Sequence, residues 1–279
     1  MGFDDRYDAV IALEHVKMSR YFLPLAALLF LASANASERS RPPPDPLADP
    51  LMIQAGFLSS HPDLRFRILG HERYKQGKHD EALKFFRRAS FYADKPSQAM
   101  VAEMLWNGEG EAQDRALAYA WMDLAAERGY PQLIAWRERY WAELDEDARE
   151  QAVNVGEEVY AKYGDAAAKP RIAGVLRRER SKVTGSRTGV AGSLQIVLPD
   201  GQQIAGSKFY DPQYWDPEKY QQWHDATWTS KTRVGRVHAS DLQEVPGAEP
   251  GLGSRVPETA PDPDAVEPEV PAEKAIPGG

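Results

Sequence analysis

The chain has 279 residues, of which 42% are hydrophobic and 27% are charged, and it contains no cysteine. The absence of cysteine excludes disulfides, thiolate metal sites, cysteine nucleophiles and a lipoprotein acylated at cysteine. The formal net charge of -8 argues against a protein that binds duplex nucleic acid, because such proteins normally have a basic face.

Residues 1–36 are predicted to be a signal peptide. We hypothesise that translation in fact starts at Met18, because the acidic residues before it are unusual at the start of a signal peptide. Arg20 provides a positive charge before an apolar stretch over residues 21–31, which is too short to span a bilayer. An A-x-A sequence predicts cleavage after Ala36. We therefore expect a periplasmic or secreted protein with no stable membrane anchor after cleavage; the alternatives are an uncleaved anchor and a buried apolar helix.

The mature chain divides by composition into a proline-rich spacer, a helical region, a basic and Gly/Ser-rich linker, an aromatic-rich β module and an acidic tail. These segments span residues 37–60, 61–169, 170–192, 193–244 and 245–279, respectively. The tail has almost no large apolar side chains. It is therefore predicted to be disordered, because it cannot bury enough surface to fold.

Two short strands are predicted on either side of Pro199-Asp200-Gly201, which is a typical hairpin turn. An aromatic stretch follows, in which two Asp-Pro pairs, at 211–212 and 216–217, are interpreted as turns. A further strand is predicted over residues 232–242. Together these elements indicate a small β or α+β module.

Two units in the helical region have a repeated pattern. In residues 67–89, small side chains let two helices approach closely, and Phe86 fills the space between them. Those small residues are Gly70, Ala82 and Ala89. In residues 101–130 the pattern is a G-x-G turn followed by Asp, a small residue, Trp, Ala-Ala and Gly. Its residues are Gly108, Gly110, Asp114, Ala118, Trp121, Ala125, Ala126 and Gly129.

The first unit resembles a tetratricopeptide repeat and the second is similar to a Sel1-like repeat, although Val101-Ala102 and Leu105 depart from that pattern. The two units are about 32 residues apart, close to the period of such arrays. A further helix pair over residues 131–164 is predicted to cap the stack. The resemblance implies a mostly α fold, a short helical-repeat solenoid with a small C-terminal module and disordered ends. A generic helical bundle is the alternative.

Such repeats imply binding on a concave face that the first helices line. The candidate residues on this face are Arg67, His71, Tyr74, Lys75, Glu103 and Trp106. A basic, aromatic stripe of this kind favours an extended acidic peptide. The alternative is that these are solvated charges beside partly packed aromatic rings.

The aromatic stretch has two interpretations. Its rings either form the core of the module or are exposed and stack on sugar rings, such as those of peptidoglycan. The candidates for glycan stacking are Tyr214, Trp215, Tyr220, Trp223 and Trp228.

No catalytic residue, cofactor or metal site is predicted. His71-Glu72 begins like a zinc motif, but Lys75 stands where the second histidine ligand belongs. We therefore expect a non-enzymatic scaffold or adaptor that binds a protein partner in the bacterial periplasm or outside the cell, with no nucleic-acid partner. The alternatives are an envelope protein that binds glycan and, more remotely, a hydrolase that uses His224 beside Asp225.

Overall fold

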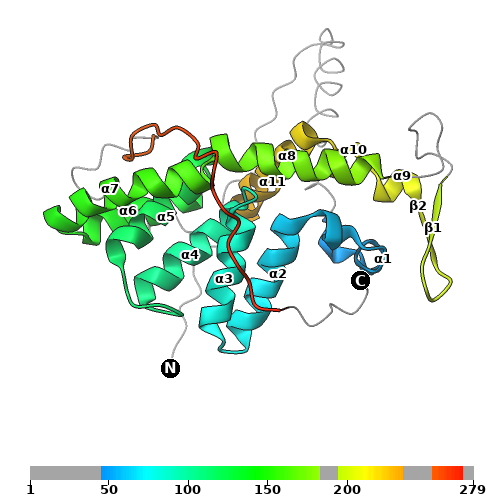
Figure 1. Cartoon of the computed structure of the whole chain (residues 1–279), viewed down its shortest axis with the longest axis horizontal. Helices are drawn as coiled ribbons and strands as arrows, with labels where there is room; N and C mark the ends of the chain where they lie inside the picture. The colour runs from blue at the N-terminus through cyan, green and yellow to red at the C-terminus, as the bar shows by residue number, and fades with distance from the viewer. Residues whose placement is uncertain (1–44, 183–193, 235–252, 273–279) are drawn as a thin grey trace, which may run out of the picture. The chain divides into compact units, whose positions relative to one another are not determined.

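The computed structural model describes residues 45–182, 194–234 and 253–272 (Figure 1). The signal peptide and its cleavage site after Ala36 lie outside these ranges and stay predictions. Of the strand expected over residues 232–242, the described residues 232–234 are instead the end of a helix, and the rest lies outside these ranges. Within the described ranges, no helix is long and apolar enough to cross a membrane.

The described residues are mostly helical, and they contain a two-stranded antiparallel sheet. The longer helices are α2 (Pro62–Lys75), α3 (His79–Ser90), α4 (Lys95–Asn107), α5 (Arg115–Ala125), α6 (Pro131–Glu143), α7 (Glu146–Tyr163), α8 (Asp165–Ser181) and α11 (Pro217–Val234). The short elements are η2 (Pro46–Ala48), α1 (Pro50–Gln54), η3 (Phe57–Ser60), η4 (Ala126–Arg128), β1 (Gln195–Val197), β2 (Gln203–Ala205), α9 (Gly206–Phe209) and α10 (Pro212–Trp215).

The first predicted helix pair is present as α2 and α3. The chain turns between them at Gly77, which has a φ of 73°. Gly70 on α2 faces the ring of Phe86 on α3, and a Cβ at Gly70 would lie 2.6 Å from that ring. Because no side chain fits in that separation, glycine is what lets Phe86 fill the space between the helices, as the sequence predicts.

The second predicted pair is present as α4 and α5. α4 ends at Gly108, which is left-handed, and the carboxylate of Asp114 accepts a hydrogen bond from the amide of Leu117 at the start of α5. Gly110 lies against the turn of the first pair, where a Cβ would be 2.6 Å from the carbonyl oxygen of His79. The glycines of the G-x-G pattern therefore end one helix and let two turns touch.

The later helices pack in a different way from the first two pairs. α6 and α7 pack mainly on α5 rather than on each other, and α8 follows α7 directly after Gly164. Residues 170–181, the basic part of the predicted linker, form the second half of α8, as the spacing of their apolar residues favours. They do so because Ile172 and Leu176 are buried on one face of that helix while Arg177 is exposed on the other.

The predicted hairpin is confirmed, since Ile196 of β1 pairs with Ile204 of β2. The aromatic stretch after it is helical, so of the two expected alternatives, a β or an α+β module, the described residues fit the α+β one. Both Asp-Pro pairs begin helices: the carboxylate of Asp211 accepts a hydrogen bond from the amide of Gln213, and that of Asp216 from the amide of Lys219. An aspartate cap followed by proline at the first helical position is a helix start as well as a turn signal.

The spacer is also partly folded. From Asp45 to Ser60 it forms the short helices η2, α1 and η3, of which the first two start at aspartate caps followed by proline. Phe57 and Met52 are buried, so this part of the spacer contributes to the core.

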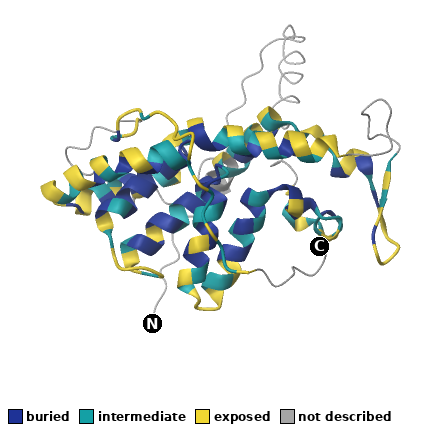
Figure 2. Cartoon of the chain, in the orientation of Figure 1, coloured by how far each residue is buried: buried dark blue, intermediate teal, exposed yellow. Residues whose placement is uncertain are grey.

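Buried side chains form two main clusters. One joins α3 to α7, and nearly every residue of α5 is buried within it (Figure 2). The other brings α1 and η3 together with α8 and the aromatic helices α9 to α11. The aromatic side chains therefore serve as core, but they pack on helices and not within a sheet module.

The C-terminal tail contacts the helices over residues 253–272, although its composition predicts disorder. Figure 1 draws this segment in orange to red, without a helix or strand. The amide of Asp262 donates to the carbonyl oxygen of Ala161 at 2.9 Å, Val256 is buried, and Glu267 pairs with Arg88. The segment needs no core of its own, because it packs on a surface that the helices already provide.

Candidate functional site

A cavity of about 410 Å³ lies between α2, α4, α5, α6 and α11. Its walls are largely aromatic and apolar, with a few charged groups at the rim. The lining residues on which the following paragraphs depend are His71, Met100, Glu103, Trp106, Trp136, Tyr140 and Trp228. The helices α2, α4 and α6 all contribute to the walls.

Stacked rings form one wall of this aromatic cavity. Trp106 of α4 stacks on Tyr140 of α6, with ring centroids 4.0 Å apart and an angle of 14° between the planes. Arg115 also lies 4.9 Å from the centroid of the Trp106 ring, so that ring has two packing partners. Trp136 packs edge-on against Tyr140 and is 39% exposed. The wall is thus a rigid aromatic surface that reaches solvent.

Glu103 provides the negative charge of the cavity. Its carboxylate makes no hydrogen bond or ion pair with any residue that the structure describes. Burial raises the pKa of Glu103, and the nearby carboxylate of Glu109 raises it further. A cationic group next to the Glu103 carboxylate would stabilise its charged form. It would compensate for the lost solvation and for the repulsion from Glu109.

His71 faces the same cavity from α2. Its ring makes an edge contact with Phe86, with centroids 5.0 Å apart. Burial and the positive charge of Arg67 lower the pKa of His71, so its imidazole is neutral at pH 7. The ring therefore adds a polar but uncharged edge to the cavity.

The structure divides the predicted binding stripe. His71, Glu103 and Trp106 line the cavity, whereas Arg67 and Tyr74 bond within the protein. Arg67 pairs with the buried carboxylate of Asp94 at 2.7 Å, and the hydroxyl of Tyr74 donates to Glu109 at 2.8 Å. Lys75 is exposed on α2 and does not line the cavity. Arg67 and Lys75 of the stripe are therefore absent from the cavity, whose described lining has one other charged basic residue, Arg139, paired with Glu143 at 3.2 Å.

Four of the five candidate glycan-stacking rings are buried. Exposure is 6% for Tyr214, 2% for Trp215, 0% for Tyr220 and 4% for Trp223. A ring buried to this extent presents no face to a sugar. Trp228 differs from them, because it extends from α11 to the aromatic cavity.

The side chains of His224 and Asp225 do not pair with each other, as a histidine base and its carboxylate would in a hydrolase. Its Nε2 lies 3.3 Å from Asp63, a buried carboxylate that also accepts a hydrogen bond from the hydroxyl of Tyr220 at 2.7 Å. Asp225 instead accepts a hydrogen bond from Tyr130 at 2.6 Å. His224 is buried and does not line the cavity, so its contacts tie α11 to the start of α2.

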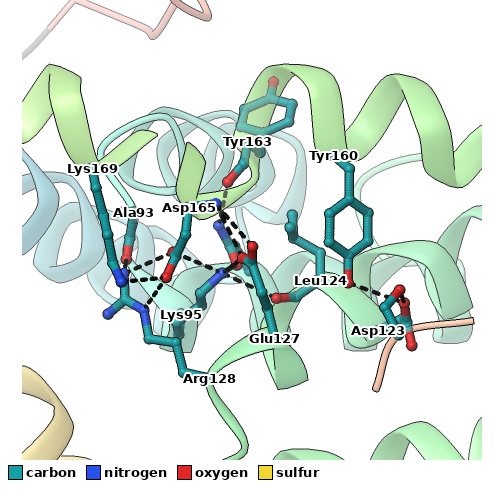
Figure 3. A network of polar contacts seen from close by, with 12 residues as sticks. Ala93, Lys95, Asp123, Leu124, Glu127, Arg128, Tyr160, Tyr163, Asp165 and Lys169 are labelled. Atoms are coloured by element: carbon teal, nitrogen blue, oxygen red, sulfur yellow. Dashed lines mark hydrogen bonds and ion pairs between the residues drawn. The ribbon is translucent and has the colours of Figure 1, made fainter. Parts of the chain in front are cut away.

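A second polar cluster is structural and lies around Lys95 (Figure 3). The ammonium of Lys95 is buried and lies 2.6 Å from Glu127 and 3.2 Å from Asp165. Arg128 donates two hydrogen bonds to Asp165, at 2.8 and 2.9 Å, and one to the carbonyl oxygen of Ala93 at 3.2 Å. These charges compensate one another, and the cluster joins the starts of α4 and α8 to η4.

Several cavity residues were not anticipated from the sequence. The largest are Trp136 and Tyr140, which come from the helix pair expected only to cap the stack. Their spacing with Leu133 at three and four residues is a signal for a shared helix face, and all three line the cavity. Among the described residues, no group of three or more metal-ligating side chains gathers at a metal site.

No protein-family model, curated protein or solved structure matches this chain. The resemblance of residues 67–130 to tetratricopeptide and Sel1-like repeats therefore rests on their sequence pattern.

Proposed function

We propose that this protein is a non-enzymatic adaptor that holds a segment of a protein partner in the aromatic cavity. The observation that carries the proposal is the cavity itself, about 410 Å³ in volume and lined by aromatic rings from separate helices. Rigid aromatic surfaces that reach solvent are typical of binding sites, because they offer large apolar area at a small loss of side-chain entropy.

The proposal includes the assignment of the two helix pairs α2–α3 and α4–α5 as tetratricopeptide or Sel1-like repeats. In such an array the first helix of each pair lines the inner face. The cavity is consistent with this assignment, since α2 contributes His71, α4 contributes Glu103 and α6 contributes Trp136. The close contact of Gly70 with Phe86 supports it as well.

The chemistry of the cavity favours a partner that presents a basic side chain beside a large apolar one. Trp106, Tyr140 and Met100 provide the apolar wall, and the Glu103 carboxylate lacks a cationic partner among the described residues. The acidic peptide suggested by the stripe has less support, because Arg67 is already paired with Asp94. A basic group next to Glu103 would form an ion pair with a carboxylate that has no other such partner among the described residues.

We further propose that the protein is exported and acts in the periplasm or outside the cell. The N-terminal sequence is the support for this location. The mature protein is then expected to begin at Ser37, and intact-mass measurement of the protein purified from the cell envelope tests that start.

A displayed peptide library selected on the full-length protein tests the binding proposal. We expect the selected peptides to combine Lys or Arg with a large apolar residue. Ala99→Phe fills the cavity from α4 and should abolish their binding, whereas Ala135→Phe, at an exposed position on α6 outside the cavity, should not. Glu103→Gln should weaken binding about tenfold through the lost ion pair.

Two results would contradict the proposal. One is a set of selected peptides without basic residues. The other is equal binding to the Ala99→Phe and Ala135→Phe variants, which would place the binding surface elsewhere on the molecule.

A further inference from the structure

Residues 253–256 of the C-terminal tail occupy a surface site formed by α5, α6 and α7. This tail site is separate from the aromatic cavity, since none of the tail residues lines the cavity. The tail sequence here is Gly253-Ser254-Arg255-Val256, and each of these residues has its own contact with the helices.

The first contacts are made by Gly253 and Ser254. The carbonyl oxygen of Gly253 accepts a hydrogen bond from Arg137 of α6 at 3.0 Å. The hydroxyl of Ser254 donates to Asp123 of α5, whose carboxylate is 0% exposed and also accepts from Tyr160 of α7 at 3.0 Å. A buried carboxylate thus offers an acceptor to a residue of the tail.

Arg255 is bound from several directions. Its guanidinium donates two hydrogen bonds to Glu138, at 2.9 and 2.5 Å, and one to the hydroxyl of Tyr119 at 3.1 Å. It also lies over the ring of Trp141 at 4.7 Å. A planar, forked group satisfies these contacts together, and lysine does not.

Val256 fits a notch on α7. It is 5% exposed, and its side chain lies against Gly156. A Cβ at Gly156 would overlap the methyl groups of Val256. The notch therefore exists because position 156 is glycine, and it matches a small branched side chain.

The tail site does not depend on the tail for its own core. Val256 lies outside the main buried clusters, and the helices around Asp123 and Trp141 pack on one another within the cluster that joins α3 to α7. The tail has no helix or strand here, bends at Ser254 to Val256, and contacts the helices through individual residues. These are the properties of a bound peptide ligand rather than of a core element.

We propose that the surface of α5, α6 and α7 is a peptide-recognition site for a Ser-Arg-Val sequence in this bent conformation, and that the tail of this chain fills it in cis. The residues that read the sequence are Asp123 for serine, Glu138 and Trp141 for arginine, and Gly156 for valine. A segment in the same chain competes with a free peptide, because its binding is intramolecular.

The test uses a fluorescein-labelled peptide of residues 253–262 and the full-length protein, with binding followed by fluorescence anisotropy. The double variant Arg255→Glu, Val256→Asp releases the tail through repulsion from Glu138 and a charge in the notch. We expect this released protein to bind the peptide about tenfold or more tightly than the wild type, in which the tail competes. An Arg255→Lys peptide should bind several-fold more weakly.

A matched pair of glycine variants, made in the released protein, tests the notch. Gly156→Val should abolish peptide binding, whereas Gly174→Val should not, because a Cβ at Gly174 has no neighbour within 4 Å. Hydrogen exchange confirms that the tail is released and that the helices stay folded.

The proposal fails if the released, folded protein does not bind the peptide, or if both glycine variants bind it equally. A concentration-dependent dimer of the wild type that Gly156→Val abolishes would support the site and identify a second copy as its partner. Peptide binding that Ala99→Phe blocks and Gly156→Val leaves intact would overturn the proposal by placing the peptide in the aromatic cavity.

Discussion

Two regions of this molecule are held together in different ways. The helix pairs α2–α3 and α4–α5 meet through close contacts of small and aromatic side chains, such as Gly70 against Phe86. The tail segment 253–272 is held on the surface by separate contacts, polar ones such as Arg255 with Glu138 and apolar ones such as Val256 against Gly156. The first kind of contact excludes water and belongs to the cooperative core, whereas we expect the second kind to open while the helices stay folded.

The Lys95 cluster and the tail both use ion pairs, but those of the Lys95 cluster are buried. Side-chain exposure is 1% for Lys95 and 7% for Arg128, compared with 25% for Arg255. Burial makes the partners of Lys95 and Arg128 obligatory, because an uncompensated buried charge is costly. The following predictions use this difference, from the largest expected effect to the smallest.

Asp165→Asn should have the largest effect. The substitution leaves the buried Arg128 without its two charged hydrogen bonds, and we expect a loss of about 3 kcal/mol in the free energy of unfolding. Urea denaturation measures the loss. Lys182→Gln, which removes an exposed ion pair with Glu179, is the control and should change stability by less than about 0.5 kcal/mol. Similar losses in both variants would contradict a special role for the buried cluster.

The same carboxylate should make stability depend on acid pH. Burial alone raises the pKa of Asp165, but Lys95 and Arg128 outweigh it and hold that pKa well below its ordinary value. The stabilisation is therefore present above the unfolded-state pKa of about 4 and is lost as the pH falls below it. Denaturation midpoints measured between neutral and acid pH should fall more steeply for the wild type than for Asp165→Asn. Parallel curves would show that Asp165 does not contribute.

Gly70→Val should destabilise the first helix pair by about 2 kcal/mol, because the new side chain overlaps the Phe86 ring and forces the helices apart. Gly174→Val is the matched control in α8, where no neighbour lies within 4 Å of an added Cβ. We expect the control to differ from the wild type by less than about 0.5 kcal/mol in urea denaturation. Equal changes in stability for Gly70→Val and Gly174→Val would indicate that the loss comes from helix propensity and not from the contact with Phe86.

Arg255→Ala should have the smallest effect on global stability, about 1 kcal/mol or less, because its ion pair lies at the surface. Its effect on the tail should be clear by hydrogen exchange. The amide of Asp262, which donates to Ala161, should exchange faster, while the amides of α2 to α5 keep their protection. Faster exchange throughout α5 would instead show that the tail is part of the core.

The helix pairs were predictable because their signals are local. Gly108 ends α4, Asp114 caps α5, and Gly70 faces Phe86, and each of these roles follows from residue type and spacing. The same reasoning placed His71, Glu103 and Trp106 on one side of the first helices. It also included Arg67, which the fold uses for an ion pair with Asp94 on another element.

The aromatic helices were harder to predict, since an Asp-Pro pair is compatible with both a turn and a helix start. The choice depends on the residues that follow. Tyr214, Trp215 and Tyr220 become buried only when α10 and α11 pack on η3 and α8, which are distant in sequence. Local signals do not contain that information.

From its amino acids alone, this chain specifies helix pairs, their turns and glycine contacts, and a hairpin, because each depends on neighbours within a few residues or on one repeated spacing. The sequence also shows that the tail has too few large apolar residues to form a hydrophobic core of its own. Tertiary packing determines the rest. It brings Trp136 and Trp228 to the aromatic cavity and the tail to Gly156, since these contacts join residues far apart in the chain and depend on shape and burial.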